Sequence, residues 1–297
     1  MDVDNAIYDI VAAHRGSDNL LINNKRCRRA IVRLATKTTA RLLSPVHYRA
    51  CTPIFPGWIV KRQVFGHLIE ATTMQYVASR TMVPVPRVYT SFIHNRQTYI
   101  VMERPEGITL FDAFETYPRE DILAIYSQLR LMIQSMRSIP LPRPYRGGVY
   151  NCNGGSVRSF RQKCYASRIG PFPTIEDFHW TMRDDFHYKT APRPPYVSPR
   201  DWEDLEDMVE LQEASDQLPV FTHGNLQPCN IIVSGRQVVS IIGWENAGFF
   251  PKYWEYTTAW TGCELNSVWK DEIDRFLDTY HDGLFCEQVR LKYWKKY

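Results

Sequence analysis

Strand-forming and helix-forming segments are divided unevenly along this chain, and that division limits the fold more than any other feature. Residues 57–65 and the β-rich stretches 88–93 and 98–104 surround one helical segment at 67–81. The rest of the chain is mainly helical, and apolar residues at helical spacing predict a long core helix at 119–138. This order predicts an α+β protein with a small strand-rich lobe, which contains one helix, followed by a larger helical lobe.

We place the boundary between the lobes at residue 104, with an N-lobe at 1–104, a C-lobe at 105–297 and a hinge at 102–107. The run at 42–57 is broken by three prolines, which predicts loops or short edge strands. A basic helix capped by Ser17 or Asp18 is expected near the N-terminus. Further helices are expected at residues 4–14, 175–187, 199–214 and 268–280.

The composition favours a globular protein of the cell interior. The seven cysteines are an odd number without a C-x-x-C pair, which argues against a disulfide framework or a zinc site. The N-terminus is acidic, and no uninterrupted apolar run approaches the roughly 20 residues that span a bilayer. We therefore expect a cytoplasmic protein without membrane insertion.

The net charge of +4 is mild, and the basic excess gathers near the N-terminus. No sequence motif for reading DNA or RNA accompanies it, so we interpret these side chains as a solvated helix face and expect no nucleic-acid partner. They are Lys25, Arg26, Arg28, Arg29, Arg33, Lys37 and Arg41.

One strip of sequence carries the strongest functional signal: FTHGNLQPCNIIVSGRQVVSIIGWENAGFF, at residues 221–250. It resembles the pattern H-G-D-L-x-P-x-N, hydrophobic strand, I-I-D-W-E of the aminoglycoside-phosphotransferase-like family, particularly its fungal branch. The resemblance extends over nearly the whole chain. Its other segments, in family order, are IVKRQ, LIEATTMQYV, MVPVPRVY, TYIVMERPEGITL, GGVYNCNGG, IGPFPTIEDF and FPKYWEY.

The resemblance implies a two-lobed protein-kinase-like fold with a cleft between the lobes. It also implies that Lys61 reaches nucleotide phosphates and pairs with Glu70, and that residues 102–104 form the hinge that contacts adenine. Asn230 would be a metal ligand. His223 belongs to the catalytic-loop motif, where its usual role is structural hydrogen bonding.

Two departures from the family pattern decide the expected function. Asn225 stands where the family has its catalytic-loop Asp, and an amide cannot take a proton from a hydroxyl near neutral pH. Gly243 stands where the family has its principal Mg²⁺-binding Asp, and glycine supplies no oxygen ligand from a side chain. We therefore expect no metal site, no cofactor and no ordinary kinase chemistry.

Other residues offer alternatives. If the strand continued past position 243, Glu245 would share a face with it and could bind the metal instead. Cys229 lies in the same loop as His223, and a Cys–His pair can be nucleophilic. Asp184, Asp185 and His187 form an ionisable cluster that is either an acid–base group or a surface helix.

Three hypotheses follow. The first is a repurposed enzyme, which binds a small apolar or aromatic metabolite between the lobes and guides a cyclisation, rearrangement or elimination of fungal secondary metabolism without ATP or Mg²⁺. The second is a non-catalytic pseudokinase scaffold or ligand sensor. The third is residual phosphotransfer through Glu245. The oligomeric state stays open.

The expected site has two groups of residues. The catalytic candidates are His223, Asn225, Asn230 and Glu245. The candidates for substrate binding are Lys61, Glu70, Met102, Glu103, Trp244 and Asp184.

Overall fold

The computed structural model describes residues 14–39, 51–142, 147–158, 168–214, 217–262 and 267–294. The helix expected at 4–14 lies outside these residues apart from its last position, as do Arg41, Cys164 and Cys263.

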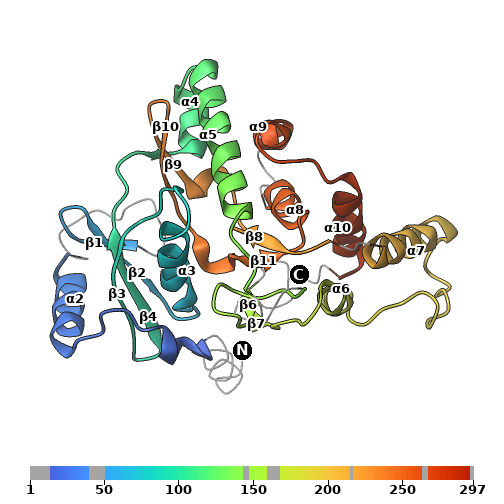
Figure 1. The fold of residues 1–297 in the computed structure, drawn as a ribbon, viewed down its shortest axis with the longest axis horizontal. Helices are drawn as coiled ribbons and strands as arrows, with labels where there is room; N and C mark the ends of the chain where they lie inside the picture. The colour runs from blue at the N-terminus through green and yellow to red at the C-terminus, as the bar shows by residue number, and fades with distance from the viewer. Residues whose placement is uncertain are drawn as a thin grey trace.

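A four-stranded antiparallel sheet forms the N-terminal region (Figure 1). Its strand order is β1-β2-β4-β3. Pro53 lies in β1 at an edge of the sheet, where a missing N–H group leaves no central ladder bond open. The strand bounds are Cys51–Phe55 for β1, Trp58–Gln63 for β2, Val88–His94 for β3 and Gln97–Glu103 for β4. The strands predicted from the sequence are therefore confirmed.

One helix packs on each face of this sheet. Helix α3 (Ile69–Ala78) shares a buried cluster with Ile59 of β2, whereas α2 (Arg26–Thr39) shares another with Val60. Successive side chains of a strand point to opposite faces, so Lys61 lies on the α3 face.

The predicted start of the basic helix is wrong. Ser17 begins a short 3₁₀ helix, η1 (Ser17–Leu20), and its hydroxyl accepts the Leu68 N–H at 3.4 Å. The chain then makes a β-bridge between Ile22 and Ser91 and enters α2 only at Arg26. Pairing with the sheet edge therefore delays the helix.

Three small sheets build the centre of the C-terminal region. Strand β5 (Ile108–Thr109) directly follows the hinge and joins an antiparallel sheet in the order β10-β9-β5. A second sheet pairs β8 with β11, and a third pairs β6 with β7. The bounds are Val157–Arg158 for β6, Arg168–Ile169 for β7, Val220–Thr222 for β8, Ile231–Ser234 for β9, Gln237–Ile241 for β10 and Gly248–Phe250 for β11.

Helices surround these sheets on the C-terminal side (Figure 1). The long helix predicted at 119–138 is confirmed as α5 (Arg119–Arg137). The others are α4 (Leu110–Thr116), α6 (Ile175–Met182), α7 (Pro199–Glu213), α8 (Trp254–Thr261), α9 (Ser267–Glu272) and α10 (His281–Trp294), with 3₁₀ turns η3 (Pro228–Asn230), η4 (Trp244–Asn246) and η5 (Ile273–Arg275).

Two helices end earlier than the sequence predicts. Helix α6 ends at Met182, and Asp184 and Asp185 take positive φ angles of 50° and 57°, which a helix cannot continue. The segment predicted as one helix at 268–280 is α9 followed by η5, and the tighter turn places Ile273, Phe276 and Leu277 in the core.

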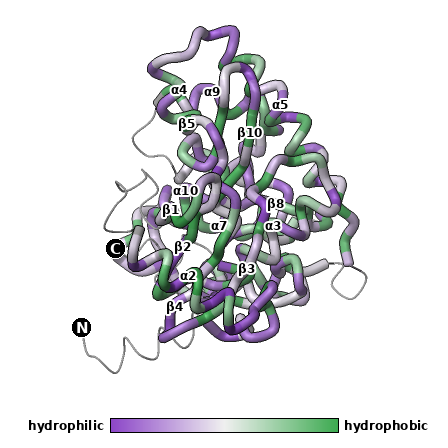
Figure 2. The backbone as a smooth tube through the Cα atoms, turned by 90° about the vertical axis from the view of Figure 1, so that its left-hand side faces the viewer, coloured by the Kyte–Doolittle hydropathy of each residue, from purple (hydrophilic) through white to green (hydrophobic). Residues whose placement is uncertain are grey.

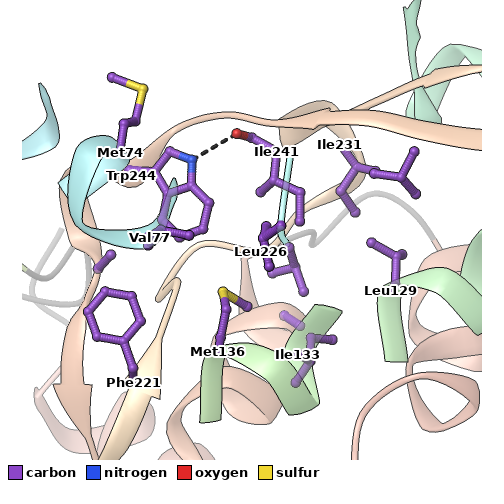
Figure 3. Close-up of a cluster of buried hydrophobic side chains, with 14 of the residues drawn as sticks. Met74, Val77, Leu129, Ile133, Met136, Phe221, Leu226, Ile231, Ile241 and Trp244 are labelled. Carbon is purple, nitrogen blue, oxygen red and sulfur yellow. Dashed lines mark hydrogen bonds between the residues drawn. The ribbon is translucent and has the colours of Figure 1, made fainter. Parts of the chain in front are cut away.

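One buried cluster joins both regions. Met74 and Val77 of α3 pack near Trp244 and Leu226, which in turn face Met136 of α5 (Figure 3). Figure 2 shows hydrophobic and hydrophilic residues alternating along the helices and strands of both regions, as elements with one buried face require. Among the helices of the described residues, none has both the length and the apolarity to cross a bilayer.

Candidate functional site

Lys61 lies at the centre of the candidate site, between two carboxylates. Its Nζ is 2.7 Å from Oε1 of Glu70, at the start of α3, and 3.1 Å from Oε2 of Glu245, in η4. The Glu70 side chain is 3% exposed and that of Glu245 is 20% exposed. The predicted pairing of Lys61 with Glu70 is present, and Glu245 is a second partner.

The three charges shift one another. Burial by itself disfavours the Lys61 ammonium, but the adjacent carboxylates outweigh it and hold its pKa above the usual value. Burial raises the pKa of Glu70 to about 7, although Lys61 opposes this. Burial also acts against the Glu245 carboxylate, yet Lys61 and a backbone N–H lower its pKa to about 2. At neutral pH Glu245, the more exposed of the two carboxyl groups, is therefore ionised, while Glu70 is near the midpoint of its titration.

Cys51 lies opposite Lys61 in the register of β1 and β2. Burial raises the pKa of its thiol to about 11, so it stays protonated at neutral pH.

The ring of His223 is fully engaged in structural hydrogen bonds. Its Nε2 is 3.0 Å from the Ile242 carbonyl oxygen, to which it donates, and its Nδ1 accepts the Asn225 N–H at 3.2 Å. Burial lowers its pKa to about 4, so the ring is neutral. His223 therefore holds the loop in place. Cys229 is exposed, whereas His223 is completely buried.

A buried carboxylate from α8 fixes the same loop. Glu255 accepts the N–H of His223 at 2.6 Å through Oε2 and the N–H of Gly224 at 3.1 Å through Oε1. Its side chain is 2% exposed, and burial raises its pKa to about 7 against these donors. Glu255 lies in the segment FPKYWEY, which resembles the family, but no sequence pattern indicates its role.

Asn230 occupies the space beside Gly243. Gly243 has φ +82°, and a Cβ atom there would lie 2.9 Å from both Cγ and Oδ1 of Asn230. The Asn230 amide donates to the Asn225 carbonyl oxygen at 2.9 Å. Glu245 follows in a 3₁₀ turn, so the condition under which it would share a strand face with position 243 is not met.

These residues do not fit a Mg²⁺ ion of the kind that phosphotransferases use. Mg²⁺ requires near-octahedral oxygen ligands, usually including one or two carboxylates. Gly243 offers no side chain, and Glu245 is bound to Lys61. Within the described ranges, no group of three or more His, Cys, Asp or Glu side chains is arranged to hold a metal ion.

The other predicted substrate contacts are scattered. Met102 is a buried core residue of β4, while Glu103 is exposed and accepts the Arg87 N–H at 3.2 Å. Trp244 has no exposed surface, and its Nε1 donates to the Ile241 carbonyl at 2.8 Å (Figure 3). Asp184 follows α6, and its charge acts on Arg290 of α10. The structure does not bring it to the Lys61 group.

Arg158 of β6 is a residue that sequence reasoning missed. Its positive charge lowers the pKa of both Glu70 and Glu245, so it lies close enough to stabilise both carboxylates. It lies three residues after the segment GGVYNCNGG, but nothing in the spacing shows that β6 returns to η4.

The fold and the placement of Lys61, Glu70 and the 221–250 strip define the class of kinase-like phosphotransferase folds. The model of the phosphotransferase enzyme family matches residues 10–293, and the chain belongs to that family. The two-lobed α+β fold predicted from the sequence is therefore confirmed.

Solved structures agree on the fold. Aminoglycoside phosphotransferase APH(4)-Ia has a TM-score of 0.57 at 16% identity, covering 81% of this chain and 78% of its own. A thermostable mutant of that enzyme, in ternary complex with ADP and hygromycin B, has a TM-score of 0.55 at 16% identity, with coverages of 81% and 79%. Spectinomycin phosphotransferase APH(9)-Ia, in complex with ADP and spectinomycin, has a TM-score of 0.51 at 11% identity, with coverages of 81% and 74%. The comparison with curated proteins finds no match.

Proposed function

We propose that this family member is not a kinase but a repurposed enzyme, whose site between the lobes binds a small apolar or aromatic metabolite. The reaction is a cyclisation, rearrangement or elimination that needs neither ATP nor a metal. The sequence resemblance favours the secondary metabolism of a fungus as the setting, and the scattered cysteines favour the cytoplasm.

The observation that carries this proposal is the absence of both family carboxylates, because Asn225 and Gly243 stand in their places. In phosphoryl transfer those acids position the attacking hydroxyl and hold the metal ion that neutralises phosphate charge. Glu245, a position at which the family pattern also has Glu, lies 3.1 Å from Lys61. Without a metal ion, a polyphosphate that approaches Lys61 would meet the uncompensated charge of Glu245.

What remains can guide proton transfer. Two carboxyl groups whose pKa values are driven apart are the usual basis of an acid–base pair. Glu245, the more exposed of the two, is held ionised at a pKa of about 2 and can stabilise developing positive charge. Glu70, with a pKa of about 7, can exchange a proton at neutral pH, and Lys61 is a donor that polarises a substrate carbonyl. Asn225 is half-buried and presents an amide for orienting the substrate.

The test separates phosphotransfer from metal-free chemistry. Purified protein is incubated with metabolite extracts and EDTA, products are followed by mass spectrometry, and ATP hydrolysis is measured in parallel with Mg²⁺. We expect product formation in EDTA that Glu245→Gln reduces at least about 100-fold, the low end of what one preorganised group that stabilises transition-state charge contributes. Glu203→Gln, an exposed change on α7, is the control. Turnover that strictly requires Mg²⁺ and ATP would reject the proposal.

The second candidate, a non-catalytic scaffold or ligand sensor, is favoured by how completely His223 and Glu255 are used for structure. A thermal-shift screen separates the two, because a ligand that binds only the folded state raises its melting temperature. If metabolites, nucleotides and metals all leave that temperature unchanged, the scaffold is favoured. Residual phosphotransfer would require Glu245 to leave Lys61 for a metal ion.

A further inference from the structure

The outer face of the N-terminal sheet is only partly covered. Helix α2 packs on it through Val32 and Ala35, which contact a cluster that includes Val60. Because Val60 and Lys61 are neighbours on one strand, this face lies opposite the Lys61 site. What binds here is therefore independent of the function proposed above.

A cavity of about 690 Å³ remains beside α2 on this face, within the range of small-molecule pockets. The side chains around it are unusually exposed for apolar residues, with 36% for Trp58, 46% for Phe55 and 55% for Ile31. Its apolar lining comes from four elements, through Ile31, Ile54, Phe55, Trp58, Val88 and Tyr89.

Aromatic rings form one wall of the cavity, and they are already arranged. The Trp58 and Tyr89 rings are stacked, with centroids 3.9 Å apart and planes 10° apart. Phe55 meets Trp58 edge-on at 6.1 Å and 88°. Rings held by one another lose little freedom when a flat ligand stacks on them, which favours binding.

Two guanidinium groups also line the cavity. The Arg87 guanidinium lies 5.8 Å from the Tyr89 ring centroid, and Arg28 projects from the first turns of α2. In the part of the chain that the structure describes, neither has an ion pair. The Glu103 carboxylate accepts the Arg87 backbone N–H, and Glu103 is not among the residues that line the cavity. The fixed charge of the cavity is therefore positive.

We propose that this cavity binds a flat aromatic molecule that carries a carboxylate. The ring stacks on an outer face of the Trp58–Tyr89 pair, and the carboxylate pairs with Arg28 and Arg87. A guanidinium binds a carboxylate through two parallel N–H donors, so the arginines select the anion while the rings select flatness.

Isothermal titration calorimetry with three matched probes tests this. 2-Naphthoate has both features, 2-naphthylmethanol lacks the charge and cyclohexanecarboxylate lacks the aromatic ring. We expect one molecule of 2-naphthoate to bind per chain, at least about tenfold more tightly than either other probe, with an affinity that falls as salt rises.

Variants assign that binding to the cavity. The double variant Arg28→Gln/Arg87→Gln should lower 2-naphthoate affinity to that of the neutral probe, and Trp58→Leu should lower the affinity for both aromatic probes. Arg62→Gln, an exposed arginine of β2 outside this cavity, is the control and should bind as the wild type does. Melting curves verify that each variant is folded. If Trp58→Leu does not fold, the double arginine variant still tests the proposal.

Three outcomes would overturn the proposal. One is no heat with any probe, and another is equal affinity for 2-naphthoate and 2-naphthylmethanol. The third is sedimentation as a dimer that Trp58→Leu dissociates and Arg62→Gln does not, which would assign the face to a second copy of the chain.

Discussion

At the scale of single residues, a neighbouring side chain leaves no room for a side chain at Gly243. Its left-handed φ of +82° is available to Asp or Asn at moderate cost, so the backbone alone does not require glycine. The obstacle is the Asn230 side chain, which fills the space that a Cβ atom would need and is held by the Asn225 carbonyl. A carboxylate at position 243 would therefore have to displace a hydrogen-bonded neighbour.

We expect Gly243→Asp to destabilise the protein by about 2 kcal/mol, since it adds left-handed strain and breaks the Asn230 hydrogen bond. Urea unfolding measures the loss, and Mg²⁺ with ATP should not reverse it. Gly235→Asp is the control, because Gly235 also has a left-handed φ of +55°, but a Cβ atom added there would meet no other atom within 4 Å. Equal losses in the two variants would mean that Asn230 yields freely.

The two partners of Lys61 should differ in their effect on stability. Glu70→Gln leaves a buried ammonium with only the more exposed partner and should cost about 3 kcal/mol, as breaking a buried pair does. Glu245→Gln leaves the shorter bond intact and should cost about 1 kcal/mol. Urea unfolding at pH 8 compares them, and a larger loss for Glu245→Gln would contradict the order.

These residue-scale features show how far sequence reasoning reaches. Comparison with the family motif was enough to show that Asn225 and Gly243 replace its two Asp residues and to predict the pairing of Lys61 with Glu70. The second partner of Lys61 could not, because it depends on a turn: η4 starts at Trp244 and rotates Glu245 toward the sheet. Alternation would have applied to Glu245 only if the strand had continued past position 243.

At the scale of elements, α8 controls the loop that carries His223. Glu255→Gln replaces one acceptor oxygen with an amide donor that faces backbone N–H groups, so we expect a loss of about 3 kcal/mol at pH 8. Urea unfolding followed by tryptophan fluorescence measures it. Glu203→Gln on α7 should change stability by less than about 0.5 kcal/mol. A loss that small for Glu255→Gln would show that the hydrogen bonds from the His223 and Gly224 N–H groups to Glu255 are not needed for stability.

The connection between β4 and β5 depends on Gly107. Its φ is +153°, and a Cβ atom would collide with the Val233 carbonyl of β9, the strand that pairs with Ile108. We expect Gly107→Ala to cost about 3 kcal/mol in urea unfolding, against about 1 kcal/mol for Gly235→Ala, which adds strain without a collision. Matching losses would mean that β9 moves aside.

Elements with a strict period were predictable, and elements set by distant contacts were not. Alternation identified β2 to β4, and the apolar spacing of α5 gave both of its ends within a residue. The start of α2 depends on the bridge between Ile22 and Ser91, which links residues far apart in sequence. The end of α6 depends on the left-handed pair Asp184 and Asp185, for which the sequence has no period.

At the scale of the whole molecule, buried titratable groups shape the response to pH. Burial lowers the pKa of His67 to about 3 and of His179 and His223 to about 4, so their contribution to stability is present above pH 6.5 and lost as pH falls through those values. Burial raises the pKa of Glu70 and Glu255 to about 7. Their contribution is present below pH 4.5 and lost as pH rises through 7.

The two sets oppose each other between about pH 6 and pH 5, where we expect the free energy of unfolding to fall by about 1 kcal/mol per pH unit on acidification. Near pH 4 Glu70 and Glu255 become protonated in the unfolded chain as well, so they no longer offset the histidines. Glu245, whose pKa is lowered to about 2 in the folded protein, also loses its stabilising contribution in this range. The slope should then reach about 3 kcal/mol per unit. Urea unfolding at closely spaced pH values checks this, and a uniform slope would refute it.

The position of Trp244 limits how the two regions can move. Its ring lies between α3 and the core of the C-terminal region (Figure 3). In addition, the Ile241 N–H donates to the Pro84 carbonyl at 2.8 Å. Rotating the N-terminal and C-terminal regions apart would expose this ring and the apolar side chains around it. Amide protons of α3 should therefore exchange with deuterium as slowly as those of α5, and a ligand of Lys61 must approach from the side on which Glu245 is 20% exposed.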